Sequence, residues 1–298
     1  MSLKTFRPCV AKITGEALEF TCGSLHKAIN DGCFALEIPG DLDVAPGIRL
    51  ANEFYLDQAD SLPGEAAAYR GFRSRDGIYF DRDYYQTEHV LIDGSRQRAE
   101  FPDSANAMCE RMYAIGRIVL RKILSATCIP PSLWHRSTDQ CSADGGVQWF
   151  AVSHYRPGKD ALGAPEHKDT GFVTVLYYEQ PGLEAFIANE WYDVPPAPGH
   201  FLVNFGGALE ALTARLPVRV RAIVHRVRQC GPSTATKGDR FSFAAFLNPA
   251  ATSEAFQVSR DGNGLVSLGS VEAFLRDFNR ATWRDDYAEF GISKPPEK

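Results

Sequence analysis

The sequence has no long apolar run and no strong excess of one charge. No stretch approaches the roughly 18 consecutive apolar residues that a transmembrane helix needs, and Met1–Lys12 lacks the apolar core of a secretory signal. The 298 residues carry a formal net charge of -5, which disfavours attraction to the polyanions nucleic acid and anionic membrane. We therefore expect a cytoplasmic protein that has neither nucleic acid nor membrane as a partner.

Paired cysteines are also absent. Seven cysteines are scattered along the chain, an odd number, and none belongs to a CxxC pair. This spacing gives no support to a zinc ribbon or a thiol redox motif. A chain of this length can bury a large core without disulfides, so we interpret the cysteines as buried free thiols in a reducing compartment.

The N-terminal third mixes helical and strand patterns. Ser24 is placed to cap a short helix that ends near Asp31-Gly32, and residues 33–38 form an apolar run typical of a strand. Residues 43–56 carry a weaker helical pattern, and we predict loops with short strands over residues 63–102. The clearest helix is predicted over 104–124, where apolar residues at spacings of three or four form one stripe: Met108, Met112, Ile115, Val119 and Ile123.

From about Val147 the pattern changes to short β-type runs. The predicted strands cover residues 149–154, 172–178, 200–204, 222–227 and 241–247, and Gly or Pro turns separate them. Many short strands with such turns indicate a sandwich or a barrel. A terminal helix is then predicted, capped by Ser270, with Val271, Phe274 and Leu275 on its apolar face.

Three residues in this β-rich region have the chemistry of metal ligands. His167 and Asp169 are two apart on a chain that we expect to be extended, so their side chains would project to one side. His225 lies in a later predicted strand. Two imidazoles and one carboxylate on one face of an octahedral ion are the facial triad of non-haem Fe(II) oxygenases. An HxD pair alone is weak evidence, because a surface or core histidine is the simpler explanation for His167 taken by itself.

The surroundings of these residues resemble a known family. The stretch HKDTGFVTVL (167–176) is similar to the HTDxGxxTxL motif of the Fe(II)/2-oxoglutarate oxygenases grouped with isopenicillin N synthase, deacetoxycephalosporin C synthase and the plant flavonoid oxygenases. Further segments match the family in order: PGLE (181–184), PGHFLVN (198–204), HRV (225–227) and RFS (240–242). One departure is Gly207, which stands where the family often has Asp; another is Lys168, whose ammonium we expect to point to solvent.

The resemblance implies the fold and the domain organisation. It implies an α+β protein with a mainly β core, a double-stranded β-helix (jelly roll, cupin-like) flanked by N-terminal helices and a C-terminal helix. We expect a single oxygenase domain over residues 1–298. Its parts would be a mixed N-terminal region (1–130), the β core (147–250) and a C-terminal arm (251–298).

The resemblance also implies the cofactors and the reaction. Fe(II) would be the metal, held by His167, Asp169 and His225, with 2-oxoglutarate as co-substrate and O2 as oxidant. Arg240 and Ser242 would anchor the distal carboxylate of 2-oxoglutarate, because a guanidinium offers a two-pronged fork to a carboxylate. Tyr155 matches a tyrosine that contacts the same molecule, although a core aromatic is an alternative. The expected reaction is oxidation, by default hydroxylation, of a small metabolite such as those of secondary metabolism.

Substrate contacts are the least constrained part of the sequence. Phe246 matches an aromatic that family members place against the substrate, and core packing explains it equally well. Arg73, Arg75 and Tyr85 lie in a polar, aromatic segment before the barrel, where such segments line the substrate mouth. They would suit a small polar or carboxylated substrate, and a solvated loop is the alternative for each. We expect a monomer.

Three other functions remain open at this point. An iron oxidase of the isopenicillin N synthase type needs no 2-oxoglutarate and uses RxS for its substrate. A non-catalytic β-helix protein that binds a metal or ligand would also keep the fold. A zinc hydrolase would share the ligand set, but the sequence supplies no general base for it and would leave RxS unexplained.

Overall fold

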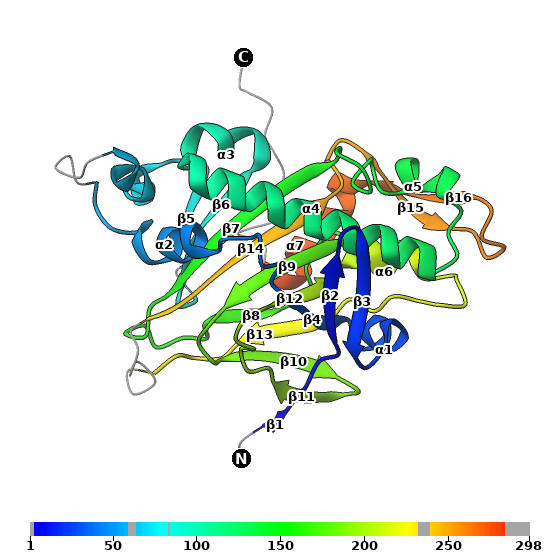
Figure 1. Cartoon of the computed structure of the whole chain (residues 1–298), viewed down its shortest axis with the longest axis horizontal. Coiled ribbons are helices and arrows are strands. Elements are labelled where there is room, and N and C mark those ends of the chain that lie inside the picture. The colour runs from blue at the N-terminus through cyan, green and yellow to red at the C-terminus, as the bar shows by residue number, and fades with distance from the viewer. Residues whose placement is uncertain (1–2, 59–63, 83, 232–238, 284–298) are drawn as a thin grey trace.

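The computed structural model describes residues 3–58, 64–82, 84–231 and 239–283 (Figure 1). In this part of the chain the strands form two large sheets and one hairpin sheet. The larger sheet has the strand order β3 (Ala17–Cys22), β2 (Val10–Thr14), β4 (Cys33–Glu37), β12 (His200–Phe205), β9 (Val173–Tyr178), β14 (Arg240–Asn248), β7 (Val147–Tyr155), β6 (Thr87–Asp93) and β5 (Tyr79–Asp81).

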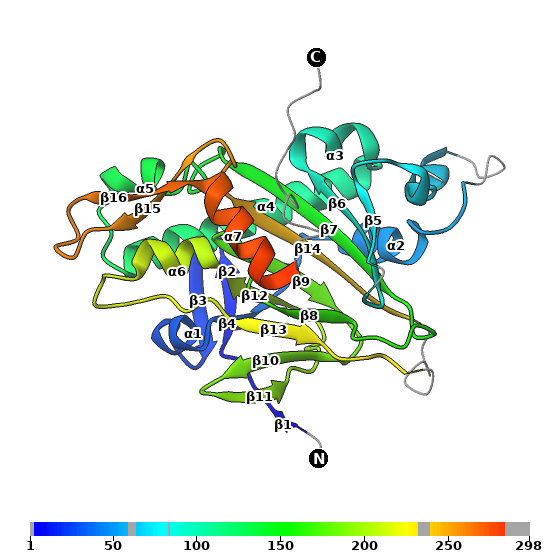
Figure 2. The ribbon, with the colours of Figure 1, turned by 180° about the vertical axis from the view of Figure 1, so that it is seen from behind.

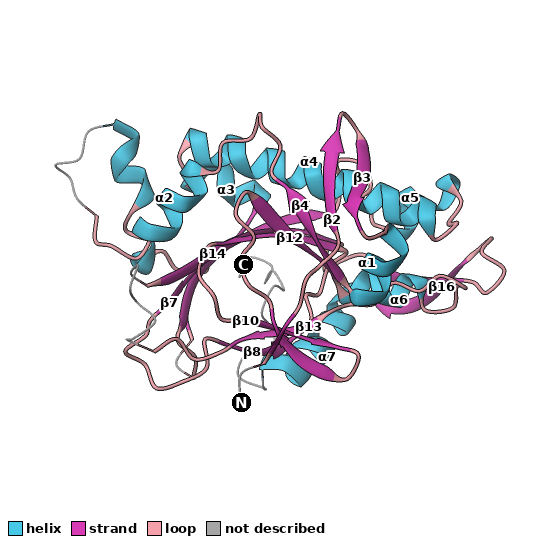
Figure 3. Cartoon of the chain, turned by 60° about the horizontal axis from the view of Figure 1, so that its bottom comes forward, coloured by secondary structure: helices cyan, strands magenta, loops and turns pink. Residues whose placement is uncertain are grey.

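The second sheet faces the larger one across the middle of the molecule (Figure 3). Its strand order is β1 (Lys4–Thr5), β11 (Glu190–Asp193), β10 (Leu183–Ile187), β13 (Val224–Val227) and β8 (Ala164–His167). The pairing is antiparallel except between β1 and β11 and between β2 and β4. Two facing, mainly antiparallel sheets form a jelly roll, which confirms the predicted fold class.

Helices cover the outer face of the larger sheet and one opening between the sheets. On the outer face α4 (Asp103–Ala126) packs against β14 and β9, and α2 (Ala45–Glu53) packs beside it (Figure 3). At the opening α7 (Val271–Trp283) crosses in front of the strands and contacts β8 (Figure 2). The remaining helices are α1 (Leu25–Asp31), α3 (Gly94–Glu100), α5 (Pro131–Ser137) and α6 (Gly207–Thr213), with 3-10 turns at Gly64–Tyr69 and Phe72–Ser74; β15 (Glu254–Val258) and β16 (Leu265–Ser270) form the hairpin.

Side-chain alternation along β14 explains how the sheet separates the core from the interior of the barrel. Phe243, Ala245 and Leu247 belong to the hydrophobic core shared with the outer helices. Their neighbours Ser242 and Phe246 line a cavity between the sheets. Successive strand side chains point to opposite faces, so one strand supplies both the core and the cavity wall.

The helices and the longer strands lie close to where the sequence predicts them. The stripe on α4 is buried as expected, and Ser24 accepts a hydrogen bond from Lys27 N–H at the start of α1. Ser270 Oγ accepts a hydrogen bond from Ala273 N–H at the start of α7, 3.1 Å away. Residues 284–298 of the expected C-terminal arm lie outside the described residues.

Other expectations are corrected by the structure. The hairpins β2–β3 and β10–β11 occupy segments that the sequence left unassigned. Two of the seven thiols, Cys22 and Cys128, are exposed instead of buried. Within the described residues no helix has both the length and the apolar character that crossing a bilayer requires.

Candidate metal and co-substrate site

Two histidines lie opposite each other on neighbouring strands of the second sheet. His167 ends β8 and pairs in register with His225 of β13, and the ring centroids are 4.3 Å apart. His167 Nδ1 lies 2.9 Å from Pro165 O, and His225 Nδ1 lies 3.2 Å from Ile223 O. A ring nitrogen that bonds a carbonyl oxygen must be the protonated one, so Nε2 carries the lone pair in both residues.

Asp169 reaches the histidines from a loop instead of from a strand. Because β8 ends at His167, the prediction that this segment opens a strand is wrong, and Asp169 lies just beyond the strand end. Backbone bonds hold the loop against the start of α6: Gly207 N–H donates to Asp169 O at 2.7 Å. A Cβ atom on Gly206 would lie 2.2 Å from the carbonyl oxygen of Gly171. The loop therefore depends on glycine at this close approach.

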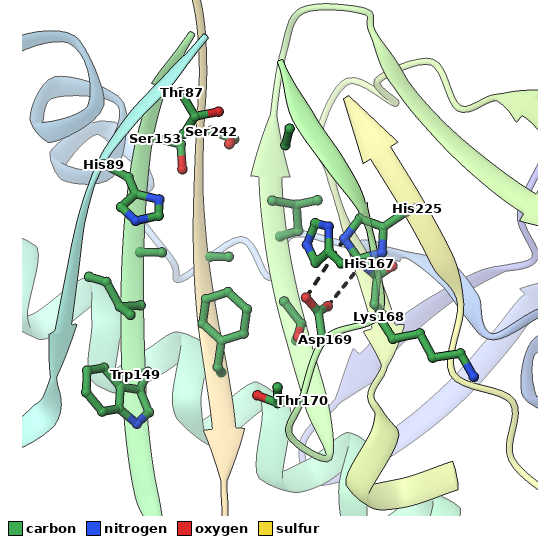
Figure 4. A pocket seen from close by; sticks show the side chains of 18 of the residues that line it. Thr87, His89, Trp149, Ser153, His167, Lys168, Asp169, Thr170, His225 and Ser242 are labelled. Atoms are coloured by element: carbon green, nitrogen blue, oxygen red, sulfur yellow. Dashed lines mark hydrogen bonds and ion pairs between the residues drawn. The ribbon is translucent and has the colours of Figure 1, made fainter. Parts of the chain in front are cut away.

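The three side chains converge on one point (Figure 4). Their candidate ligand atoms all lie within 4.8 Å of one another, and His225 Nε2 is 3.8 Å from Asp169 Oδ1. An ion with bonds of about 2.1 Å bridges atoms up to about 4 Å apart, so small side-chain adjustments suffice. Burial and the neighbouring His225 lower the pKa of His167 to about 4, which keeps the ring neutral, as a ligand requires.

Polar neighbours fix the segments that carry these side chains. Asn204 on β12 donates through Nδ2 to Asp169 Oδ2 at 3.4 Å. Glu210 on α6 forms an ion pair with Lys168 at 2.5 Å and accepts from Ala222 N–H at 3.0 Å. The ammonium of Lys168 points away from the convergence point (Figure 4). Glu210 therefore joins the Asp169 loop to the segment that precedes β13.

A buried arginine lies on the larger sheet. Arg240 is 4% exposed, and its guanidinium carbon lies 4.3 Å from the ring centroid of Tyr155. Its Nε donates to Pro181 O at 3.3 Å, whereas its buried Nη1 has no hydrogen-bond partner among the described residues. Ser242 follows two residues later on the same face of β14, 3.4 Å from the Tyr155 hydroxyl. A buried guanidinium nitrogen without an acceptor is costly, and an incoming carboxylate would satisfy it.

Comparison with known proteins agrees with this arrangement. A family model described as the 2OG-Fe(II) oxygenase superfamily matches residues 146–249. That segment contains His167, Asp169, His225, Arg240 and Ser242. Residues 146–249 belong to the 2OG-Fe(II) oxygenase superfamily. Members of this superfamily require Fe(II), 2-oxoglutarate and O2, and the donor set described above fits Fe(II).

Relatives of this chain include plant proteins named as oxidases and dioxygenases. The chain is 24% identical to 1-aminocyclopropane-1-carboxylate oxidase 3 of Arabidopsis thaliana, over 82% of this chain and 78% of the relative. It is 31% identical to 2'-deoxymugineic-acid 2'-dioxygenase of Hordeum vulgare, over 66% of this chain and 59% of the relative. For 2-oxoglutarate-dependent dioxygenase 21 of rice, the match spans only 47% of the relative.

Solved structures show the same fold. JOX2, solved in complex with 2OG, Fe and JA, superposes with a TM-score of 0.66 at 14% identity, over 98% of this chain and 91% of that chain. The dioxygenase for auxin oxidation of rice gives a TM-score of 0.59 at 22% identity, over 86% of this chain and 88% of that chain. These likenesses support the jelly roll.

The protein encloses a cavity of about 220 Å³ that contains the convergence point and Arg240. The expected substrate residues Tyr85 and Phe246 line it. Arg73 and Arg75 do not. Arg73 forms a two-pronged ion pair with the buried Glu88, at 2.6 and 2.8 Å, and Arg75 binds Glu100 at 2.9 Å. These partners give the two arginines structural roles in place of the expected substrate contacts.

Several residues that line the cavity were not predicted from the sequence as site residues. They are Arg82, His89, Trp149, Asn204 and Asn248. Thr87, His89 and Leu91 alternate on β6 and all line the cavity, so period-two spacing in TEHVLID was a usable signal. For Arg82 the sequence offers no such signal, because the residue lies in the turn between β5 and β6 and outside the strand alternation.

Proposed function

We propose that the protein is an Fe(II)- and 2-oxoglutarate-dependent dioxygenase that oxidises, most simply by hydroxylation, a small-molecule metabolite. The single observation that carries the proposal is the convergence of His167, Asp169 and His225 in the cavity that also holds Arg240. We propose these three residues as the Fe(II) ligands and Arg240, Ser242 and Tyr155 as the 2-oxoglutarate contacts. We also propose that the protein acts as a monomer, because one chain supplies all these groups.

The residues around the metal position have separate tasks. His167 and His225 present lone pairs from Nε2 because their Nδ1 atoms are held by backbone carbonyls, and Asp169 contributes the negative charge. With only these three protein ligands, a bound Fe(II) would keep coordination positions for 2-oxoglutarate and O2. Bound Fe(II) supplies the ability to activate O2 at the expense of 2-oxoglutarate, which is oxidised to succinate and CO2.

Arg240 holds the co-substrate at a fixed distance from the metal position. Its buried guanidinium would donate to the distal carboxylate, and the Ser242 hydroxyl would donate a further hydrogen bond. Stacking against Tyr155 restricts the guanidinium plane. The same wall continues into Ala151, Ala244 and Phe246, which leave space for the substrate between the co-substrate and α7.

The test is an anaerobic titration followed by a substrate screen. Wild-type protein with Fe(II) should develop a weak visible charge-transfer band when 2-oxoglutarate is added, and a metabolite panel in air should then reveal compounds that stimulate succinate formation. His225→Ala should show neither the band nor succinate while its circular dichroism stays native. Turnover without succinate would favour an oxidase of the isopenicillin N synthase type. Bound iron without any band would contradict the proposal.

A further inference from the structure

One row of side chains crosses the inner face of the larger sheet, from the metal ligands to the opposite wall of the cavity. Asn204 of β12 pairs in register with Thr174 of β9. Thr174 pairs in turn with Phe246 of β14, and Phe246 with Trp149 of β7. All four residues line the cavity. Neighbouring strands lie about 4.8 Å apart, so the row is about 14 Å long, and Trp149 lies across the cavity from Asp169 (Figure 4).

The end of this row nearest the metal ligands holds a hydrogen-bond acceptor without a donor. Asn204 is 1% exposed, and its Nδ2 donates to Asp169 Oδ2. A carboxylate can only accept hydrogen bonds, so Nδ2 and not Oδ1 must face Asp169. The buried Oδ1 has no hydrogen-bond partner among the described residues. Leaving a buried acceptor unpaired is costly, and a donor group in the cavity would remove that cost.

The adjacent Thr174 has the same property. It is 3% exposed, and its buried Oγ1 has no hydrogen-bond partner in the part of the chain that the structure describes. Most buried side-chain polar atoms in proteins have at least one partner, so two unpaired neighbours on a cavity wall indicate a ligand. Directly opposed residues of an antiparallel pair have Cβ atoms about 4.5–5.5 Å apart. One small polar group can therefore contact both Thr174 and Asn204.

The rest of the row is large and apolar. Phe246 and Trp149 complete it, and Phe274 of α7 lines the same cavity. The next row towards the co-substrate end contains Ala244 and Ala151, which pair in register and also line the cavity. Their small side chains leave space beside the two aromatic rings. A flat apolar body can therefore lie against Phe246 and Trp149 with one edge directed to the polar end of the row.

The two polar atoms define which chemical group fits between them. The amide oxygen of Asn204 can only accept a hydrogen bond, whereas the hydroxyl of Thr174 can either accept or donate. A group that binds both must therefore donate to Asn204, as a hydroxyl or an N–H does. An ionised carboxylate has no proton to donate, so it would leave Asn204 Oδ1 unpaired. The polar end of the row thus favours an uncharged hydrogen-bond donor.

We propose that Thr174 and Asn204 form a subsite that accepts a hydrogen bond from a hydroxyl or N–H group of the prime substrate, and that the substrate has a flat apolar body. This inference rests on the proposed function, because it assumes that the Arg240 end of the cavity receives 2-oxoglutarate. The apolar body lies against Phe246 and Trp149. The donor group lies beside Asp169, so the part of the substrate that carries it is the part nearest the metal position.

The test compares hydrogen-bond donors with their methylated counterparts. Full-length protein is loaded without oxygen with Fe(II) and saturating 2-oxoglutarate, and the visible band is recorded first, so failure of the proposed function is seen before any probe is added. Two uncharged pairs, indole with 1-methylindole and 2-naphthol with 2-methoxynaphthalene, are then titrated by calorimetry, which needs no turnover. The donors should bind about 2- to 12-fold more tightly, since one net hydrogen bond separates the members of each pair.

Variants then assign the preference to Thr174. Thr174→Val keeps the branched shape and removes the hydroxyl, so it should at least halve the affinity ratio of each pair, with Asn204 alone remaining. The melting temperature without ligand should stay the same or rise, because an unsatisfied buried hydroxyl is removed, and the 2-oxoglutarate affinity should stay within about threefold. Thr174→Ser should keep the wild-type ratio. Thr14→Val, at an exposed position of β2 outside the cavity, is the matched control.

Three results would overturn the proposal. Two of them come from wild-type protein and hold even where Thr174→Val does not fold: equal binding of both members of each pair, or no binding of either donor at millimolar concentration. The third is an unchanged affinity ratio in Thr174→Val, because the preference would then arise elsewhere in the cavity.

Discussion

Replacing Arg240 by glutamine tests the co-substrate site most directly. In wild-type protein the guanidinium is buried, and its Nη1 has no acceptor among the described residues. A bound 2-oxoglutarate would supply that acceptor through its distal carboxylate. Hydrogen bonds that involve charged groups contribute about 1.5–3 kcal/mol each. Losing a two-pronged contact, about 3–6 kcal/mol in all, should therefore weaken 2-oxoglutarate binding by about 100- to 10,000-fold.

The stability of the unliganded protein should respond differently. Arg240→Gln would lose the bond to Pro181 O and the contact with Tyr155, but it would also remove an unsatisfied buried charge. Because these effects offset each other, we expect the melting temperature without ligand to stay within a few degrees of wild type or to rise. A large drop in affinity without a drop in stability is a combination that a purely structural arginine would not produce.

The assay is an anaerobic titration of the Fe(II)-loaded protein with 2-oxoglutarate, followed by the visible band and by calorimetry. Arg240→Lys should lie between wild type and Arg240→Gln in affinity, because it keeps the charge but loses the planar fork. Arg228→Gln is a matched control, since Arg228 forms an ion pair with Asp193 and does not line the cavity. If Arg240→Gln binds 2-oxoglutarate within threefold of wild type, the assignment of this site is wrong.

Three further predictions concern the metal and the frame around it. Asp169→Ala should abolish Fe(II) binding in a metal titration while circular dichroism remains native; wild-type affinity would refute its role as a ligand. Burial by itself raises the pKa of Glu88, but hydrogen bonds led by that from His154 outweigh it and hold the pKa well below its usual value. The ionised Glu88 therefore stabilises the fold above about pH 4.3, and this contribution is lost as the pH falls. Glu88→Gln should lower the unfolding free energy at pH 7 by about 3 kcal/mol and make it depend less on pH in the acid range. Urea denaturation at several pH values measures both effects, and unchanged denaturation curves would contradict the prediction. Gly206→Ala places a methyl group 2.2 Å from Gly171 O. It should lower the unfolding free energy by about 1–3 kcal/mol and weaken metal binding. Unchanged stability and unchanged metal affinity would contradict this prediction.

The sequence predicted the site better than it predicted the segments that hold it. His167, Asp169 and His225, which the structure brings together, could be predicted as ligands because metal ligands require particular side chains, and motif order added the RxS pair. The sequence placed Asp169 within a strand, whereas β8 ends at His167, because two residues do not show whether a strand begins or ends there. Convergence of this loop depends on Gly206 and on backbone bonds to α6, which no local pattern encodes.

Substrate residues were less predictable for a related reason. Arg73 and Arg75 are as polar in sequence as Arg82, yet Arg82 lines the cavity and the other two meet Glu88 and Glu100. The difference lies in carboxylates from other elements, one of which is on β6 and the other on α3. Which carboxylate each arginine binds depends on the tertiary structure. The composition of the segment therefore indicated that it lies near the cavity, but not which of its arginines lines it.

Strand β14 connects the two ends of the cavity, and this arrangement separates co-substrate binding from substrate selection. Arg240, Ser242, Ala244 and Phe246 share one face at alternate positions, so the co-substrate end and Phe246 are about 20 Å apart along the strand. A one-residue slip in register would turn all four into the core and destroy both ends together. A substitution at one position leaves the register intact. Ala244→Val, midway between the ends, should therefore restrict substrates by bulk while 2-oxoglutarate affinity stays near wild type, and a tenfold loss of that affinity would show that the two ends are not separate.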